Sequence, residues 1–544
     1  MIKKIITLVC FYLSISVCSY ASPEQLNQDQ HFDALLNGLT VKSFSDKQQV
    51  IDQIVESKHK RSLSILKQLL DGKIYYRKSD EQLFVVELTD KQANLYTPIT
   101  MEWVETLPKK KLKKVGINNK LRGILKRSIA QLSLADNDPI VRKNAATAIM
   151  SSVDDSIAKL IINRLQVESD QSVRDELSTA INIYTLNSDD ESEVLNAVKA
   201  LSTSLHSETR VALKKLQEKI SQQSPTESRV LLLEHIEDSL YDIQSSVNFY
   251  KQVENIFFGL SLGSVLLLAA VGLAITFGVM GVINMAHGEM LMLGAYTTYI
   301  VQLLMPQSIE YSLIVALPMA FLFTALVGIG IERGVIRFLY GRPLETLLAT
   351  FGISLILQQA VRTFISPQNR AVASPEWISG SLQINPALAL TYNRLYIIIF
   401  AFMVLAGLML LLKKTNFGLQ IRAVTQNRSM AKAMGIRTDW VDAFTFGLGS
   451  GIAGMAGVAL SQLTNVGPNM GQAYIIDSFM VVVFGGVGNL WGTLFGAMSL
   501  GIANKYIEPL TGAVVAKVVV LVFIILFIQK KPSGMFALKG RSAD

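Results

Sequence analysis

Three ionisable side chains interrupt long apolar stretches in the C-terminal half of the 544-residue chain. They are His287, Glu289 and Asp477. Because a charge at membrane depth is costly, an ionisable residue there is a candidate functional residue by default. Glu289 and Asp477 could equally lie at the membrane interfaces, in contact with water. No metal site is expected, since His287 is the only histidine after residue 235 and partner ligands are missing.

Two glycine-rich breaks in the apolar stretches each contain an asparagine. The first is Gly-Val-Ile-Asn at 281–284, and the second is Gly-Val-Gly-Asn at 486–489. Glycine-interrupted segments in both halves of a membrane protein typically mark a substrate path near the bilayer midplane. Small residues also let helices pack closely, which is the alternative interpretation. We expect Asn284 and Asn489 to lie on a translocation path together with the three ionisable residues.

The chain has no signature of catalysis or of nucleotide binding. No Gly-x-x-x-x-Gly-Lys-Ser/Thr sequence occurs, and Gly72-Lys73 is followed by Ile74. The membrane half holds no nucleophile, paired carboxylates or metal cluster that could form a catalytic site. We therefore expect a transport component that is not an enzyme, needs no cofactor and relies on a separate protein for ATP hydrolysis.

A basic segment rich in small residues, 418–436, lies between two apolar stretches and is too polar to enter lipid. Its pattern predicts one helix that ends at Gly435. An exposed loop helix of this kind is typical of a docking element for a soluble partner.

Apolar stretches long enough to cross a bilayer recur from Ile256 onward. Eight can be read, at 256–283, 286–304, 311–332, 346–366, 394–412, 441–463, 475–504 and 513–529. The positive-inside rule places the loop with Arg333, the segment 413–440 and the basic tail in the cytoplasm. A chain that starts outside the cytoplasm and ends inside it needs an odd number of crossings. We therefore expect 475–504, which contains the second glycine-rich break, to be broken or doubled.

The net charge of +8 belongs to the membrane half. From residue 256 onward there are 18 Lys and Arg against 10 Asp and Glu, whereas the preceding residues contain 33 of each kind. This excess is the usual bias of cytoplasmic loops, so it implies no nucleic-acid partner. With 50% hydrophobic residues and a mean hydropathy of +0.35, part of the chain should lie in lipid.

The first residues fit a secretory signal at 1–21. Lys3 and Lys4 precede an apolar run, and Ser-Tyr-Ala at 19–21 offers a cleavage site. Both cysteines, Cys10 and Cys18, lie inside this segment, so a cleaved chain would contain no thiol. An uncleaved anchor is the alternative, and either way the following residues are expected in the periplasm.

Residues 22–250 are polar, with apolar positions at helical spacing, and predict a soluble, mostly helical domain. The phrase Asp-x-x-Val-Arg occurs at 138–142 and 170–174, with a fainter copy at 207–213. It resembles a HEAT repeat, in which an acidic turn caps the second helix of each pair. Unrelated amphipathic helices are the alternative. The stretch 74–100 breaks the pattern and predicts a small strand element.

Several motifs of the C-terminal half resemble the branched-chain amino-acid permease family of ABC importers. They are Asn-x-Ala-His-Gly at 284–288, the Arg-Ala to Gly-Ile loop at 422–436, Gly-Gly-Val-Gly-Asn-Leu-Trp-Gly at 485–492 and Lys-Pro-Ser-Gly-Met-Phe at 531–536. The resemblance covers about 255–537. It implies a polytopic α-helical membrane permease at 251–544 in the bacterial inner membrane. Together with the exported HEAT-like domain expected at 22–250, this predicts an all-α chain.

The resemblance also implies partners. These are two ATP-binding subunits, a homologous second permease subunit and a periplasmic solute-binding protein. In that family the cytoplasmic loop contains a coupling helix that docks on the ATPase. By position, that role falls to Arg422, Ala423, Ala431 and Gly435.

Within the family, the segments 375–380 and 465–479 are similar to urea permeases, which implies urea as the solute. Urea is neutral and planar, so amide and hydroxyl groups suit its path, and Gln472 and Ser478 join the two asparagines as candidates. A permease for branched-chain amino acids or short amides is the nearest alternative. An energy-independent urea channel and a membrane-tethered interaction protein belong to other classes. The docking loop argues against the channel, and the glycine-broken spans argue against the tether.

Overall fold

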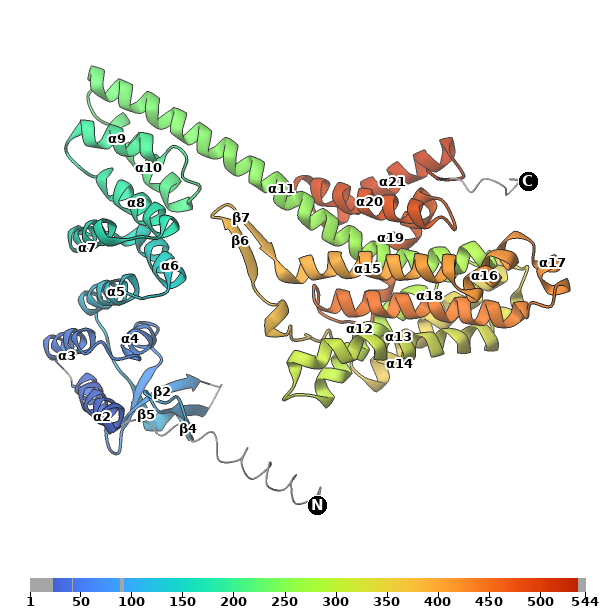
Figure 1. Cartoon of the computed structure of the whole chain (residues 1–544), viewed down its shortest axis with the longest axis horizontal. Helices are drawn as coiled ribbons and strands as arrows, with labels where there is room; N and C mark the ends of the chain where they lie inside the picture. Colours follow the sequence, from blue (N-terminus) through green and yellow to red (C-terminus); the bar gives the residue numbers. More distant parts are fainter. Residues whose placement is uncertain (1–22, 42, 89–91, 537–544) are drawn as a thin grey trace, which may run out of the picture. The chain divides into compact units, whose positions relative to one another are not determined.

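The computed structural model describes residues 23–41, 43–88 and 92–536. The chain divides into two compact units, one that ends at Gln244 and one that begins at Ser245 (Figure 1). The predicted signal segment 1–21, with Cys10 and Cys18, lies outside the described residues.

The first unit begins with short helices packed around a shared apolar core. They are α2 (Pro23–Asn37), the 3-10 turn η1 (Gly38–Thr40), α3 (Phe44–Glu56) and α4 (Ser62–Leu70). Apolar residues three apart, such as Ile51 and Ile54 on α3, are fully buried because this spacing places them on one helix face.

A five-stranded antiparallel sheet follows these helices. Its strands are β1 (Ile74–Arg77), β2 (Leu83–Leu88), β3 (Gln92–Tyr96), β4 (Trp103–Pro108) and β5 (Leu112–Lys114), with the 3-10 turn η2 (Lys109–Lys111) before β5. The order is β4-β3-β2-β1-β5, so β4 forms one edge, where Trp103 is 62% exposed. The prediction of an all-α chain is therefore wrong. The strand element expected at 74–100 extends to Lys114. β4 is mostly exposed and β5 is only three residues long, so neither gives the buried apolar alternation that marks a strand.

Six helices complete the first unit and stack in succession. They are α5 (Asn119–Leu134), α6 (Pro139–Ile149), α7 (Asp155–Val167), α8 (Gln171–Thr185), α9 (Glu191–Leu201) and α10 (Ser207–Ser221), with the turn η3 (Met150–Ser152) after α6. Asp138 and Asp170 cap α6 and α8, because each carboxylate accepts a backbone N–H of the following turn.

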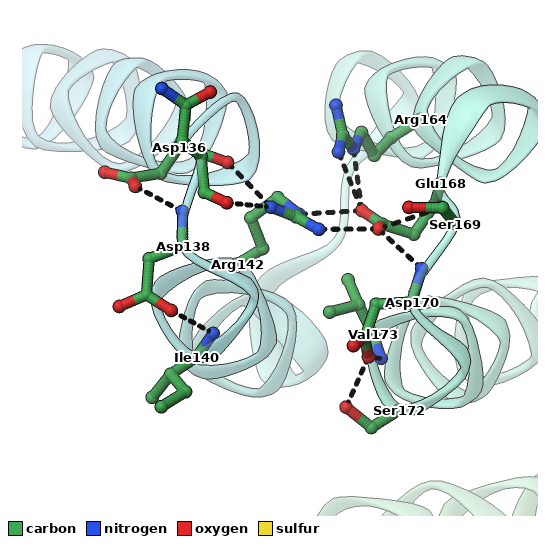
Figure 2. A network of polar contacts seen from close by, with 11 residues as sticks. Asp136, Asp138, Ile140, Arg142, Arg164, Glu168, Ser169, Asp170, Ser172 and Val173 are labelled. Carbon is green, nitrogen blue, oxygen red and sulfur yellow. Dashed lines mark hydrogen bonds and ion pairs between the residues drawn. The ribbon is translucent and has the colours of Figure 1, made fainter.

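A buried ion-pair network connects these two caps (Figure 2). Arg142 donates to both carboxylate oxygens of Glu168, at 2.8 Å from Nε and 2.7 Å from Nη2. Its Nη1 also donates to the carbonyl oxygens of Asp136 and Asn137. Glu168 accepts further hydrogen bonds from Arg164 and from the Asp170 N–H, and its side chain is fully buried.

The first unit is not a HEAT-repeat domain. A sheet lies within it, its helices are unequal in length, and the cap residue of α10, His206, makes no side-chain cap. The recurring Asp-x-x-Val-Arg phrase marks the N-caps of α6 and α8. Capping is a local interaction that any helix can use, so the phrase alone does not specify a repeat.

The second unit is helical apart from one hairpin. Its helices are α11 (Glu227–Met280, from Ser245 in this unit), α12 (His287–Leu304), α13 (Ile309–Gly334), α14 (Pro343–Phe364), α15 (Tyr392–Lys414), α16 (Asn416–Gln426), α17 (Arg428–Ala433), α18 (Thr438–Ser461), α19 (Met470–Gly485), α20 (Leu490–Thr511) and α21 (Ala513–Lys530). The turns η4 (Ile336–Leu339) and η5 (Glu376–Ile378) and the hairpin β6 (Ser381–Asn385) and β7 (Leu388–Thr391) lie in the connections.

Six helices of the described chain are long and apolar enough to cross a membrane: α11, α13, α14, α15, α18 and α21. The sequence predicted eight apolar spans. The difference comes from α12, α19 and α20, which are shorter or carry polar residues such as Glu289 and Asn504. These helices pack against other helices of the unit, and an interior helix does not need a uniformly apolar surface.

Glycines bring the central helices into backbone contact. α18 packs against α12 and α13, as Figure 1 shows. At the first of these contacts Gly294 faces Gly454, and a Cβ on Gly294 would collide with the Gly454 carbonyl oxygen. Close packing is therefore one real use of the glycines in this unit.

Candidate functional site

Asn284 lies in the turn between α11 and α12, His287 is the first residue of α12, and both are buried. The Asn284 Oδ1 accepts the N–H of Ala286 at 3.0 Å and so stabilises the start of α12. The His287 Nε2 donates to the carbonyl oxygen of Ala269 at 2.9 Å. Among the described residues, the Asn284 Nδ2 and the His287 Nδ1 have no hydrogen-bond partner. A structural role by itself does not explain two unsatisfied buried polar atoms on residues three positions apart.

Glu289 is enclosed by three helices and is only 1% exposed. Its Oε1 accepts hydrogen bonds from Ser354 at 2.9 Å and from Gln358 at 2.7 Å, both on α14. Gly471 of α19 lies on the other side, where a Cβ would be 2.6 Å from Oε2. The sequence did not single out Ser354 and Gln358, although their spacing of four residues places both on one face of α14.

Asp477 forms an ion pair that the sequence analysis missed. Its Oδ2 lies 2.8 Å from the Nζ of Lys517, which joins α19 to α21. Lys517 was detectable, since it is the one charged residue within the predicted span 513–529. The neighbouring Ser478 is buried and donates to the Tyr474 carbonyl oxygen within its own helix, at 2.8 Å. Gln472 is exposed near the start of α19.

Asn489 lies in the break of the segment predicted to be interrupted. The structure confirms the break, because α19 ends at Gly485 and α20 begins at Leu490. Gly486 has a φ of +104°, which favours glycine. The Asn489 Oδ1 caps α20 by accepting the N–H groups of Trp491 and Gly492, at 3.0 and 3.3 Å. Asn284 and Asn489, both predicted to lie on the translocation path, therefore also stabilise the first turns of α12 and α20.

The segment 418–436 forms two helices, so the prediction of one helix is wrong. α16 ends at Gln426, and Asn427 then caps α17 by accepting the Met430 N–H at 2.9 Å. An asparagine that competes for backbone hydrogen bonds favours such a boundary. Of the predicted coupling residues, Arg422 and Gly435 are exposed, Ala423 is half-buried and Ala431 is buried.

Arg428, at the start of α17, connects this loop to the membrane helices. Its guanidinium pairs with both carboxylate oxygens of Asp442 on α18 and donates to the Tyr340 hydroxyl at 2.9 Å. It also lies 4.0 Å from the centre of the Tyr340 ring. Sequence reasoning missed this contact, because the three residues lie in different segments of the chain.

Two cavities of the second unit contain predicted residues. The inner cavity, about 510 Å³, is lined by α11, α15, α16 and the turn 488–491, and includes both Asn489 and Arg422. The outer cavity, about 220 Å³, includes Asp477. They share no lining residue. Their residues on α11, 262–266 and 274–279, face opposite sides of that helix at about 100° per residue. The other predicted path residues line neither of these cavities.

Comparisons with known proteins agree on one kind of protein. Residues 255–529 match the family described as the permease component of a branched-chain amino acid transport system. The chain is 29% identical to the high-affinity branched-chain amino acid transport system permease protein BraD of Pseudomonas aeruginosa, over 53% of this chain and 96% of the relative. It is 32% identical to the corresponding LivH protein of Salmonella typhimurium, over 53% of this chain and 97% of the relative. The ribose import permease protein RbsC of Escherichia coli is 27% identical over 53% of this chain and 88% of the relative. No solved structure matches.

Proposed function

The chain belongs to the branched-chain amino acid transport permease family and is the permease subunit of an ABC importer, without ATPase activity, and within that family we propose that its solute is urea. Two segments that resemble urea permeases, 375–380 and 465–479, support this solute. The chain that leads into the first segment pairs with the second, since Arg370 exchanges two backbone hydrogen bonds with Val466, at 2.7 and 2.8 Å. This arrangement is the observation on which the choice of urea rests.

The proposed path starts at the outer cavity and ends at the inner one. Asp477, within the second urea-like segment, lines the outer cavity, and Asn489 lines the inner one. The cavities are on opposite sides of α11, so a route between them needs surface from elsewhere. We propose that a homologous second permease subunit completes the path.

The two loop helices, α16 and α17, are the proposed docking element for two ATP-binding subunits. Arg422, Lys432 and Gly435 are exposed there and present a basic surface. The positive-inside rule places this loop in the cytoplasm. The first unit then lies in the periplasm, where a solute-binding protein would deliver the solute.

A branched-chain amino acid is the second candidate solute. Two of the named relatives, BraD and LivH, are permease proteins of branched-chain amino acid transport systems. The outer cavity also contains side chains of both charge signs, including Asp477 and Arg394. Groups of both signs are what a zwitterion requires.

The test is uptake of radiolabelled urea and leucine by cells that express the chain with its transporter partners, with the chain omitted as control. ATP-dependent accumulation of urea that excess leucine does not inhibit supports the proposal. Accumulation of leucine that excess urea does not inhibit assigns the second solute instead. Entry of urea that continues without ATP contradicts the importer and favours a channel.

A further inference from the structure

The outer cavity is formed by six membrane helices and carries several charged groups. It lies where α19 and α21 begin and α18 and α20 end, with α11 and α15 as further walls. Its charged side chains are Arg394, Asp477, Lys505, Glu508 and Lys517. Two ion pairs lie among them, Asp477–Lys517 at 2.8 Å and Lys505–Glu508 at 2.6 Å.

Lys517 places a charged group on the wall of this cavity. Its side chain is 49% exposed although α21 is among the most apolar helices of the unit. An ionisable group on a membrane helix normally faces a water-filled cavity or the protein interior, or lies near a helix end from which it reaches water. Lys517 is the fifth residue of α21, roughly 6 Å along the axis from its first residue. Its ammonium therefore lies close to the start of the helix, where it lines the cavity within reach of water.

Asn504 supplies a second observation. It is 8% exposed, and its Oδ1 has no hydrogen-bond partner among the described residues although it lines the cavity. Burying an amide oxygen without a donor is costly, so such an atom is expected to meet a donor in some state of the protein.

We propose that the outer cavity is a binding subsite for a small, net-neutral solute with an acceptor oxygen at one end and N–H donors at the other. Lys517 and Arg394 are donors for the oxygen, and Asp477 and Asn504 are acceptors for the N–H groups. Urea and an α-amino acid share this chemistry. The inference rests on the proposed function, because it assigns a site to the solute of that importer.

Cysteine labelling tests whether solute occupies the cavity. Ala513→Cys places a thiol on its wall, and Val514→Cys places one on the next residue, which is 77% exposed and does not line it. Both variants also carry Cys10→Ser and Cys18→Ser and are studied in membranes with the transporter partners present. A thiol-reactive methanethiosulfonate should modify both cysteines. Saturating urea or leucine should slow modification at 513 by about tenfold and leave 514 unchanged.

Each labelling result decides the proposal. Protection by urea alone or by leucine alone supports the subsite and identifies the solute class. Equal labelling at 513 with and without either solute overturns it. A thiol at 513 that never reacts unless the partner permease is omitted also overturns it, because the partner then covers the cavity.

A charge exchange separates solute binding from structural pairing. Lys517→Met leaves Asp477 unpaired, whereas Asp477→Lys with Lys517→Asp keeps the ion pair and reverses its direction. If the pair orients a solute, the double variant should recover the wild-type amount of protein but keep an apparent KM raised about tenfold. Full recovery of both protein and KM would show a purely structural pair.

Two controls keep this inference distinct from the proposed function. The Oδ1 of Asn393 is also buried without a partner, but Asn393 does not line the cavity. The KM of the Asn393→Leu variant should therefore equal that of the wild type. Asn504→Leu should raise KM. If wild type transports neither urea nor leucine, the proposed function fails. If it transports one of them and all cavity variants behave like Asn393→Leu, only the subsite fails.

Discussion

At the scale of single residues, Glu168 shows how a buried charge is stabilised. The Arg142 guanidinium, which donates two hydrogen bonds to this carboxylate, lowers the pKa of Glu168 from about 4.5 to about 2. Because the folded-state pKa is the lower one, the carboxylate contributes stability above about pH 4.5. That contribution is lost as the pH falls from about 4.5 towards 2.

Glu168→Gln should therefore destabilise the first unit by about 3 kcal/mol at pH 7, since it leaves Arg142 without its buried partner. The difference from wild type should shrink between pH 4.5 and 2. Pulse proteolysis of the full chain in guanidinium chloride, with cleavage sites mapped to α5–α8, measures it. Asp80→Asn, which removes the half-exposed partner of Arg77, is the control and should cost less than about 1 kcal/mol. A pH-independent difference for Glu168→Gln would contradict the assigned ion pair.

Substitutions of Arg422 and of Arg428 should impair uptake in different ways. Arg422 is exposed, so Arg422→Glu should prevent binding of the ATP-binding subunits and abolish uptake. Arg428 faces Asp442 and Tyr340 on the permease itself, so Arg428→Met should retain the ATPases yet reduce uptake per ATP hydrolysed by about tenfold. Co-purification and coupled uptake–ATPase assays measure the two steps. Loss of ATPase binding in Arg428→Met would place this residue in the docking surface instead.

At the scale of elements, the broken segment determines the topology. α19 and α20 are separate helices joined by 486–489. If α12, α19 and α20 also cross, the six candidate spans become nine. Nine is an odd number, as a chain that starts in the periplasm and ends in the cytoplasm requires. We expect each of the three to cross the membrane.

Single cysteines test this count, in the background without Cys10 and Cys18. Val487→Cys, between α19 and α20, should react from the cytoplasmic side, as should Met434→Cys in the docking loop. Thr511→Cys, at the last residue of α20, should react only from the periplasmic side. Val487 and Thr511 accessible from the same side would show that α20 does not cross.

The sequence predicts features that depend on local signals better than those that depend on tertiary contacts. Glycines and Asn489 predicted the break between α19 and α20, because backbone conformation and capping are encoded nearby. The same kind of local signal gives a wrong prediction at Asp138 and Asp170, where two helix N-caps resemble a HEAT repeat. The Asp477–Lys517 and Arg428–Asp442 pairs join segments far apart in the chain, so no local pattern could place those charges together.

At the scale of the whole molecule, the family match begins at residue 255 and leaves the whole first unit unassigned. That unit offers helices and a sheet edge but no metal cluster among its described residues. We propose that it recruits the solute-binding protein, which is a binding role and not a step in translocation.

Deleting 24–245 should leave a permease that inserts and binds its ATPases. Uptake should fall by about tenfold at solute concentrations below KM, because a tethered delivery step is lost, while the maximal rate stays the same. Flux measured in vesicles against solute, at several levels of added binding protein, distinguishes these effects. Zero flux at every concentration, despite normal insertion and ATPase association, would place the first unit in the transport mechanism itself.

The exposed edge strand gives the first unit an optical signal of its own. Trp103 is the only tryptophan before residue 244, and the others are Trp377, Trp440 and Trp491. Its indole is 62% exposed, against 42% for Trp377, 49% for Trp440 and 52% for Trp491. Iodide should therefore quench the fluorescence of Trp103 strongly. A protein that covered the β4 edge would shield the indole, so recruitment to the first unit could be followed by emission from the unlabelled chain.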